Sequence, residues 1–311
     1  MKRCVVFAYH NVGCRCLSVL LDQGVEVSLV VTHEDDPGEN HWFGSVAELA
    51  RENGIPVITP EDPNVPEVVA RVRALQPDFL FSFYYRRMLK AGLLETPGHG
   101  ALNMHGSLLP RYRGRAPVNW AVLRGERETG ASLHYMELKP DAGDLVDQQA
   151  VPILRDDTAL DVFHKVTWAA EVVLARSLPL LVQGRAPRIS LDLQQGSYFG
   201  GRRPEDGRID WSASAAEIHN LIRAVAPPYP GTFTTLAGEP LRIFRSRPVS
   251  GSVRYPEEVP CFYWENGKCY ADCADGRRLQ ILSFELGGDV RSAEEFRARF
   301  ASRPQKLGEH P

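Results

Sequence analysis

Residues 103–110 read NMHGSLLP and begin where a predicted buried strand, residues 100–103, ends. Asn103 and His105 lie two positions apart, so an extended backbone would point both side chains to the same side. A side-chain amide can donate a hydrogen bond to a developing oxyanion. An imidazole titrates near neutral pH and can take up or release a proton. Taken alone, however, the pair is more typical of an Asn and a His that bond to loop backbone.

A second motif, KPDAGD at residues 139–144, ends a predicted strand at residues 130–137 with turn-forming and acidic residues. If Asp141 were buried beside His105, its charge would favour the imidazolium form of that ring. The plain alternative is an aspartate that stabilises a turn. The motif therefore adds a candidate partner for His105 without proving the contact.

Two basic segments carry groups that bind anions or flat rings. Arg111, Arg113 and Arg115 could hold carboxylates or phosphates, or could form a solvated face. Residues 83–87, FYYRR, close another predicted strand, and their aromatic rings could stack on a heterocycle or belong to the core. For each segment, the sequence supports a binding role and a structural role equally well.

The elements that must position these residues alternate along the first half of the chain. We predict strands at residues 4–8, 25–32, 56–58, 78–83 and 100–103, and helices at residues 14–21, 44–53 and 67–75. Such alternation indicates βαβ units and a mostly parallel sheet. In open α/β sheets ligands gather at the carboxyl ends of the strands, where residues 103–110 would lie. The first loop carries only Gly13 and lacks GxGxxG, so a dinucleotide site is weakly supported.

The second half is expected to change architecture. A strand pair at residues 130–137 and 145–151 precedes a long helix at residues 159–182, with Asp157 or Thr158 as its cap and Pro179 as a kink or early stop. Residues 194–207 are rich in Gly and Arg and predict a linker. After a capping box at Ser214, short strand-like runs predict a small β-barrel, at residues 232–235, 241–245, 260–264, 268–271 and 279–284, before a helix at residues 292–300. We therefore predict a catalytic domain at residues 1–203 and an OB-like domain at residues 204–311.

Composition narrows the function class. The 311 residues are 43% hydrophobic and carry a formal net charge of -3. The overall charge therefore does not favour binding to nucleic acid. No apolar run reaches the roughly 18 residues of a membrane span, and no signal peptide is evident, which predicts a cytoplasmic protein. The six cysteines form no CxxC pair, so we expect reduced thiols and no metal site.

Together the motifs resemble those of the folate-dependent formyltransferases. The resemblance rests on N-x-H-x-S-L-L-P, then RGRAP at residues 113–117, then DAG at residues 141–143, and it spans about residues 1–300. FAYHNVGC, THEDDPGE, SFYYR and YFGGRRPEDGRIDW resemble the branch that acts on nucleotide-linked amino sugars. The resemblance implies a Rossmann-like domain followed by an OB-type barrel. It also implies transfer of formyl from 10-formyltetrahydrofolate to the 4-amino group of UDP-4-amino-4-deoxy-L-arabinose, for lipid A modification.

The resemblance also implies roles for single residues. His105 would be the acid/base, Asn103 would stabilise the oxyanion, and Asp141 would orient His105. By matched position, the folate-binding residues would be Arg87, Met88, Leu89, Arg115, Glu137, Leu138, Lys139 and Pro140. Candidate acceptor-binding residues are Arg202, Arg203, Tyr229 and His10, of which the arginines could equally face solvent and Tyr229 could be packing.

Three rival functions share part of this pattern. Methionyl-tRNA formyltransferase needs a basic loop for phosphates, but the matching loop here carries acids that would repel them, Glu34, Asp35, Asp36 and Glu39. A formyltetrahydrofolate hydrolase would use the same three residues with water as the nucleophile. A non-catalytic folate- or nucleotide-binding module would not need them.

The sequence does not decide whether the nucleotide of the acceptor is UDP or dTDP. It also leaves open the oligomeric state, and whether the chain works alone or as one domain of a larger enzyme.

Overall fold

The computed structural model describes residues 2–38, 40–301 and 303–308. It divides into two compact units. Unit 1 comprises the described residues of Met1–Pro117, Glu128–Pro152 and Phe163–Gly200, and unit 2 those of Val118–Arg127, Ile153–Val162 and Gly201–Pro311. Each unit has its own sheet. The predicted boundary between residues 203 and 204 stays a prediction.

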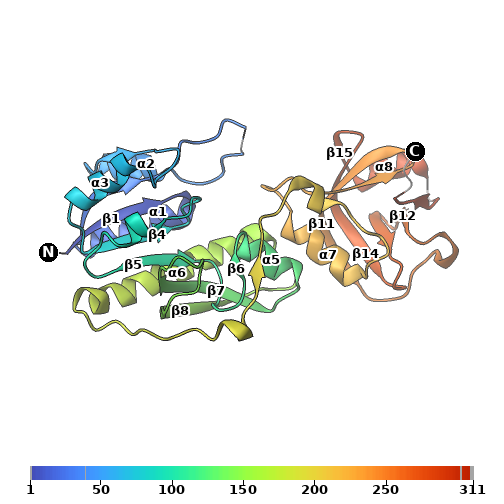
Figure 1. Cartoon of the computed structure of the whole chain (residues 1–311). Helices are drawn as coiled ribbons and strands as arrows, with labels where there is room; N and C mark the ends of the chain where they lie inside the picture. Colours follow the sequence, from blue (N-terminus) through green and yellow to red (C-terminus); the bar gives the residue numbers. More distant parts are fainter. Residues whose placement is uncertain (1, 39, 302, 309–311) are drawn as a thin grey trace. The chain divides into compact units, whose positions relative to one another are not determined.

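Unit 1 is built on a seven-stranded sheet of order β3-β2-β1-β4-β5-β7-β8 (Figure 1). The first five of these strands pair in parallel, whereas β7 and β8 are antiparallel to their neighbours. The strands are β1 (Arg3–Ala8), β2 (Glu26–Val31), β3 (Val57–Ile58), β4 (Phe79–Phe83), β5 (Ala101–His105), β7 (Glu128–Tyr135) and β8 (Leu145–Pro152). The order reverses between β1 and β4, and in such sheets the ligand site lies at the carboxyl ends of the strands beside that reversal.

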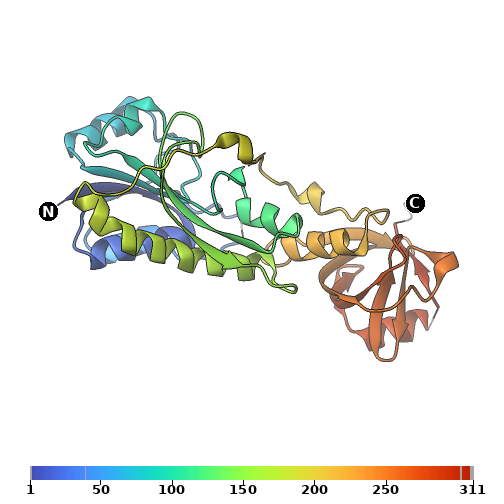
Figure 2. The same ribbon diagram turned by 90° about the horizontal axis from the view of Figure 1, so that it is seen from below.

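Helices cover both faces of this sheet. Val5 and Phe7 of β1 pack with Val68 and Val72 from one helix and with Leu93 from another, in a single buried cluster. On the other face α1 and α6 run side by side along the sheet (Figure 2), joined by hydrogen bonds between their side chains. The helices of unit 1 are α1 (His10–Asp22), α2 (Val46–Glu52), α3 (Pro66–Ala74), α4 (Ala91–Leu94) and, from Phe163 onward, α6 (Ala159–Val182), whereas α5 (Pro117–Leu123) lies in unit 2 except for its first residue.

Unit 2 is an antiparallel sheet of order β10-β11-β14-β13-β12-β16, with β15 paired to β14. A bridge between Leu236 and Leu307 and a bond from the Gly308 N–H to the Thr235 carbonyl (3.1 Å) bring its two edges together, so the sheet nearly closes into a barrel. The elements are β10 (Thr232–Leu236), β11 (Glu239–Val249), β12 (Cys261–Glu265), β13 (Lys268–Asp272), β14 (Arg278–Leu286), β15 (Asp289–Arg291), β16 (Gln305–Lys306), α7 (Ala215–Ala224) and α8 (Ala293–Phe300).

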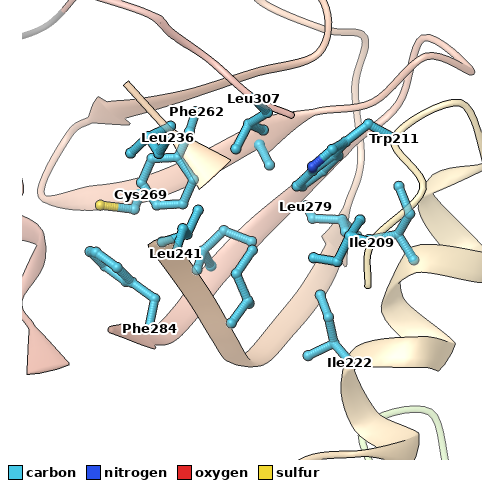
Figure 3. Close-up of a cluster of buried hydrophobic side chains, with 14 of the residues drawn as sticks. Ile209, Trp211, Ile222, Leu236, Leu241, Phe262, Cys269, Leu279, Phe284 and Leu307 are labelled. Carbon is cyan, nitrogen blue, oxygen red and sulfur yellow. The ribbon is translucent and has the colours of Figure 1, made fainter. Parts of the chain in front are cut away.

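The core of this barrel is aromatic and aliphatic. Figure 3 shows Phe262, Phe284 and Trp211 in a cluster with Leu241 and Leu279, all of them buried. Helix α7 adds apolar side chains to the cluster, and the predicted capping box at its start is present. The fold class predicted from the sequence, a Rossmann-like domain with a mostly parallel sheet and a small β-barrel, is confirmed.

Several element boundaries differ from the prediction. Helix α1 starts at His10, four residues before the predicted start, because His10 turns the chain directly after β1 with φ of 67°. The predicted bounds of α6, residues 159–182, are confirmed: Pro179 does not stop the helix, and Thr158 Oγ1 caps its first turn by accepting from the Asp161 N–H (3.3 Å). Asp157 accepts instead from the Leu154 N–H (2.6 Å).

The predicted linker at residues 194–207 is wrong in part. It contains the short strand β9 (Tyr198–Phe199), which pairs in parallel with β6 (Arg113–Gly114). This pairing holds the candidate catalytic loop and therefore belongs to the site.

Within the part of the chain that the structure describes, no helix is both long and apolar enough to cross a bilayer.

Candidate active site

Strand β5 carries Asn103 and His105 to the carboxyl edge of the parallel sheet. It pairs in parallel with β4, where Ser82 faces Asn103, and antiparallel with β7, where Ser132 faces His105. The two-residue spacing places both side chains on one face of the strand. His105 is only 6% exposed, so its ring is fixed by the protein rather than by water.

Both nitrogens of the His105 ring face oxygen acceptors. Its Nε2 lies 2.8 Å from the Tyr112 carbonyl, and its Nδ1 lies 3.5 Å from Oδ1 of Asp141. A carbonyl and a carboxylate can only accept, so a neutral ring with one N–H can donate to only one of them. The charged imidazolium, with two N–H groups, can donate to both. Each ring nitrogen therefore has an oxygen acceptor within reach, and the two contacts hold the ring in place.

Asp141 is held as a buried carboxylate. Burial by itself raises the pKa of the carboxyl, but the positive charge available on His105, a hydrogen bond from His134 and the Gly114 N–H at 2.8 Å outweigh it, so the pKa of Asp141 falls far below its ordinary value. The backbone of Asp141 is left-handed, with φ of 50°, which Asp tolerates better than most residues. The turn of residues 139–144 thus brings the predicted carboxylate to His105.

Serine hydroxyls fix the loop between His105 and Tyr112. Ser132 Oγ on β7 donates to the Ser107 carbonyl (2.6 Å) and accepts from the Leu109 N–H (3.1 Å). Ser107 Oγ donates to the Arg111 carbonyl (2.6 Å). Ser107 and Ser132 are both fully buried. The loop is therefore clamped from inside, and the Tyr112 carbonyl keeps its place against His105.

The β6–β9 pairing clamps the same loop from outside. Ser197 Oγ accepts from the Tyr112 N–H (2.9 Å), and the Tyr112 ring stacks on Phe199 with centroids 5.2 Å apart. Gly114 has φ of 97°, and a Cβ there would lie 2.2 Å from the Phe199 carbonyl oxygen, so no other residue fits without movement. Because the Gly114 N–H also binds Asp141, this close approach helps to position the carboxylate.

Asn103 is not oriented by His105 but by a second histidine. Its Nδ2 lies 3.1 Å from Nε2 of His134, which faces Asn103 across the β5–β7 pair. The same His134 nitrogen lies 3.7 Å from Oδ1 of Asp141. One amide, two imidazoles and one carboxylate thus form a single buried group. The three residues predicted as catalytic, Asn103, His105 and Asp141, are brought together in unit 1.

An aromatic cluster lies at the strand reversal between β1 and β4. The His10 ring stacks on Phe43 with centroids 3.9 Å apart and meets the edges of Trp42 and Phe163. Its Nδ1 is buried and has no hydrogen-bond partner among the described residues. Burial, with a smaller contribution from Arg86, lowers the pKa of His10 to about 3, so the ring is neutral at physiological pH.

This cluster is continuous with the catalytic loop. Phe163 also contacts Tyr84, which follows β4, with ring centroids 5.8 Å apart. The Tyr84 hydroxyl lies against Gly106, where an added Cβ would come within 2.0 Å of it. A row of rings therefore leads from His10 to the residue next to His105. A buried, unpaired nitrogen in a backbone of positive φ is the kind of strain that accumulates at functional sites.

The predicted folate-binding residues fall into two loops of unit 1. In the loop after β4, Arg87 and Met88 are exposed, whereas the Leu89 side chain is buried in the core. Leu89 could therefore contact a ligand through its backbone but not through its side chain. Asn64 holds this loop by donating to the Met88 carbonyl (2.9 Å) and accepting from the Lys90 N–H (2.7 Å). Of the other residues, Pro140 is half-buried, and those exposed are Arg115, Glu137, Leu138 and Lys139.

The predicted acceptor residues other than His10 belong to unit 2. The Arg202 guanidinium lies 5.0 Å from the centroid of the Trp120 ring and donates to the Asp206 carbonyl (3.1 Å). Burial lowers the pKa of Arg202 and raises that of Tyr229. The Arg203 side chain is exposed, and the backbone N–H of Arg203 donates to the Asp206 carboxylate (2.8 Å).

The sequence motifs did not single out three residues of the site, His134, Ser132 and Ser197. A signal for the first two was present, because alternation along the predicted strand at residues 130–137 puts Ser132 and His134 on one face. Ser197 lay in a segment predicted to be a linker. Among the described residues, no group of three or more His, Cys, Asp or Glu is placed to hold a metal ion.

The geometry suits acyl transfer to an amine, because it combines an amide donor, an imidazole and a carboxylate. Comparison with known proteins agrees. The Formyl transferase family profile matches residues 6–178, and the profile of the Formyl transferase C-terminal domain matches residues 202–300.

Solved structures share the fold. An N-formyltransferase from Helicobacter canadensis, in complex with folinic acid and dTDP-3-aminofucose, is 23% identical with a TM-score of 0.72, over 90% of this chain and 98% of that one. WlaRD, a sugar 3N-formyl transferase solved with dTDP and 5-N-formyl-THF, is 21% identical with a TM-score of 0.70, over 90% of this chain and 97% of that one.

A 4-N formyltransferase from Francisella tularensis is 19% identical with a TM-score of 0.62, over 75% of this chain and 91% of that one. At these identities the likeness shows the fold alone. The two family profiles, however, match most of the chain. The resemblance seen in the motifs is confirmed: this protein belongs to the formyltransferase family and is an enzyme that transfers a one-carbon formyl group.

Proposed function

We propose that this enzyme transfers the formyl group of 10-formyltetrahydrofolate to the 4-amino group of UDP-4-amino-4-deoxy-L-arabinose, a sugar used to modify lipid A. The observation that carries the proposal is the buried contact of His105 with two acceptors, the Tyr112 carbonyl and Asp141, beside the amide of Asn103. This is the set of groups that formyl transfer to an amine requires.

The reaction follows from these residues. The uncharged amine attacks the formyl carbon, a C–N bond forms, and the carbonyl electron pair moves to oxygen. Asn103 donates an amide N–H to that oxyanion. His105 passes its Nε2 proton, which otherwise bonds to the Tyr112 carbonyl, to the departing folate nitrogen, and takes one proton from the new ammonium. The bond from the formyl carbon to the folate nitrogen then breaks as the carbonyl re-forms.

Asp141 supports His105 through charge. Its lowered pKa keeps it ionised throughout the working pH range. A carboxylate 3.5 Å from the ring stabilises the imidazolium that the proton transfers require. Asp141 is therefore proposed to orient and charge His105 without itself receiving a proton.

The donor is proposed to bind at the loop after β4 and the loop of residues 137–140. The exposed backbone and side chains of Arg87 and Met88, with Leu89 as an inward anchor, would line the pterin side. Solved relatives of the same fold hold folinic acid or 5-N-formyl-THF, which supports a reduced folate as donor. Arg115 is exposed and would meet the negative tail of the folate.

The acceptor is proposed to be a nucleotide-linked amino sugar. The row of rings from His10 to Tyr84 offers flat apolar faces for a sugar ring, and the orphan Nδ1 of His10 offers one hydrogen bond to a hydroxyl. Arg202, Arg203 and Tyr229 belong to unit 2, and their roles in binding the diphosphate and the sugar or nucleotide stay predictions from the sequence. One solved relative is in complex with dTDP-3-aminofucose, and two others are a sugar 3N-formyl transferase and a 4-N formyltransferase, which supports this class of acceptor.

A tRNA acceptor is disfavoured by the loop after β2. Asp35 accepts from the Tyr9 hydroxyl (2.8 Å), and Asp36 accepts from the Gly38 N–H (2.8 Å), so both acids are built into the loop. Glu34 is exposed, and Glu39 lies outside the described residues. Such a loop would repel a phosphate backbone. The partners are thus proposed to be small molecules, and the six free cysteines fit a cytoplasmic enzyme.

A panel of acceptors tests the proposal. The purified enzyme would be given 10-formyltetrahydrofolate and one of UDP-4-amino-4-deoxy-L-arabinose, dTDP-linked 3-amino sugars, dTDP-linked 4-amino sugars or methionyl-tRNA, with products read by mass. We expect a gain of one CO on the UDP sugar. Formylation of another acceptor alone would overturn the proposed substrate. Formate release that no acceptor alters would indicate a hydrolase.

A further inference from the structure

We infer that His33 is a positioning residue for the formyl donor: together with Asn64 it fixes the backbone of residues 84–90, the donor loop, in the shape that binds folate. The inference rests on the proposed donor site, which places three of its binding residues in this loop. His33 is the second residue of the THEDDPGE motif, and the mechanism proposed above gives it no part.

His33 follows β2 and reaches the start of the donor loop. Its ring stacks on the Tyr85 ring, with centroids 4.2 Å apart, and its Nε2 accepts from the Arg86 backbone N–H (3.0 Å). A backbone N–H can only donate, so Nε2 carries no proton and the ring is neutral. Burial, followed by the charges of Arg86 and Arg87, lowers the pKa of His33 to about 4, so this acceptor persists at physiological pH.

The His33 ring is itself fixed by neighbouring rings. Tyr85, on which it stacks, packs against the core of unit 1 and meets the edge of Phe7 of β1, with centroids 5.3 Å apart. Tyr9, at the end of β1, meets the His33 ring at 5.2 Å, and the Arg86 guanidinium lies 4.6 Å from the centroid of the Tyr9 ring. Turning Nε2 away from the loop would therefore break several ring contacts.

Asn64, which precedes α3, holds the other end of the donor loop. Its Nδ2 donates to the Met88 carbonyl (2.9 Å), and its Oδ1 accepts from the Lys90 N–H (2.7 Å). A carbonyl only accepts and an N–H only donates, so these partners fix the orientation of the amide. Leu89 lies between them with its side chain in the core. Arg87 is thus presented between two anchored stretches of backbone.

Fixing the loop in the free protein lowers the cost of binding a ligand. A mobile loop would lose backbone entropy when the donor binds, whereas a loop that already has its bound shape loses little. The bonds from His33 and Asn64 set that shape without using the ligand. Loss of one such hydrogen bond corresponds to about a five- to tenfold change in an equilibrium constant. The effect should fall on affinity for the donor and not on proton transfer at His105.

Two substitutions separate positioning from packing. His33→Phe keeps a flat ring against Tyr85 but offers no acceptor to the Arg86 N–H, whereas His33→Gln keeps an acceptor near the place of Nε2. With the reduced folate folinic acid as probe, we expect Kd to rise about five- to tenfold in His33→Phe and to stay within about threefold of wild type in His33→Gln. With whichever panel acceptor wild type formylates, kcat at saturating donor and KM for the acceptor should change little in either variant.

A matched control is His99→Phe in the same unit. His99 precedes β5, and its ring nitrogens contact Lys2 (2.9 Å) and Asp78 (3.5 Å) at the amino edge of the parallel strands. The donor loop follows β4 and lies at the carboxyl edge. The control should therefore leave the Kd for folinic acid unchanged.

Hydrogen exchange gives a readout without ligand. Arg86 is exposed, so the bond to His33 is what protects its backbone N–H. We expect that amide to exchange faster in His33→Phe than in wild type or His33→Gln, at similar melting temperatures. Wild-type Kd and exchange in His33→Phe would overturn the inference, as would equal losses in the Phe and Gln variants that follow their melting temperatures. Failure of wild type to bind folinic acid would instead overturn the proposed donor site, and this inference with it.

Discussion

Replacing Asp141 with Asn removes a charge while keeping the shape of the site. Asn accepts the left-handed backbone at this position, φ of 50°, as readily as Asp. Its Oδ1 can still accept from the Gly114 N–H, which places its NH2 group where a carboxylate oxygen now faces Nδ1 of His105. His105 would then have to accept at Nδ1 and donate at Nε2 to the Tyr112 carbonyl, which fixes it in the neutral form.

The expected loss of activity in Asp141→Asn follows from the distance between the Asp141 carboxylate and the His105 ring. A unit charge 3.5 Å from the imidazolium stabilises it by about 5 kcal/mol at an effective dielectric constant of about 20. Solvent reaches Asp141, whose side chain is 13% exposed, and the new amide recovers one hydrogen bond, so we expect about 3 to 4 kcal/mol to be lost. At about 1.4 kcal/mol per tenfold change, kcat should fall by roughly 10²- to 10³-fold.

The assay is kcat for formyl transfer by the wild type and by Asp141→Asn, with circular dichroism to show that both proteins are folded. The control is Asp144→Asn, which removes a charge from the same motif, where the carboxylate accepts from Ser190 (3.0 Å); it should cost less than about tenfold. Activity of folded Asp141→Asn within a few-fold of wild type would refute the reasoning.

Three further expectations concern the scaffold. Ser132→Ala leaves the Ser107 carbonyl and the Leu109 N–H without their buried partner, so the free energy of unfolding in urea should fall by about 1–3 kcal/mol; an unchanged value would mean that the clamp is dispensable. Gly114→Ala forces a Cβ against the Phe199 carbonyl oxygen, 2.2 Å away, and should lower kcat by at least tenfold in protein that still folds by circular dichroism; normal turnover would show that the loop can move aside. The pKa of His10 is about 3 in the folded protein and about 6.5 when unfolded, so the unfolded state binds more protons between these values and stability falls as pH drops below about 6.5. At pH 5 this group should cost roughly 2 kcal/mol, and His10→Gln should lose less stability than wild type between pH 7 and 5; equal losses would contradict a neutral buried ring.

Local patterns in the sequence predicted the parts of the site that one strand controls. Strand alternation placed Asn103 and His105 on the same side, and the apolar character of residues 100–103 predicted the buried strand that is β5. The contact of Asp141 with His105 needed the family resemblance, because the turn that carries it is distant in sequence. Turn chemistry alone would have left Asp141 as a structural residue.

The remaining parts depend on registers between distant segments. Which residue faces Asn103 is decided by the antiparallel pairing of β5 with β7, and a shift by one residue would have turned His134 away. Pairing of β6 with β9 joins residues 113–114 to residues 198–199, so composition alone predicted a linker there. The start of α1 at His10 was hidden for a similar reason, since a positive φ in a non-glycine residue is fixed by the packing of its ring.

The proposal that one imidazole relays both protons is tested most directly by turnover of His105→Ala. The ring is buried, and among the described residues its nitrogens contact the Tyr112 carbonyl and Asp141, so the variant should fold, as circular dichroism would show. We predict that its kcat for formyl transfer falls by at least about 10³-fold and that added imidazole restores part of it. A folded variant with kcat near that of wild type would contradict the mechanism.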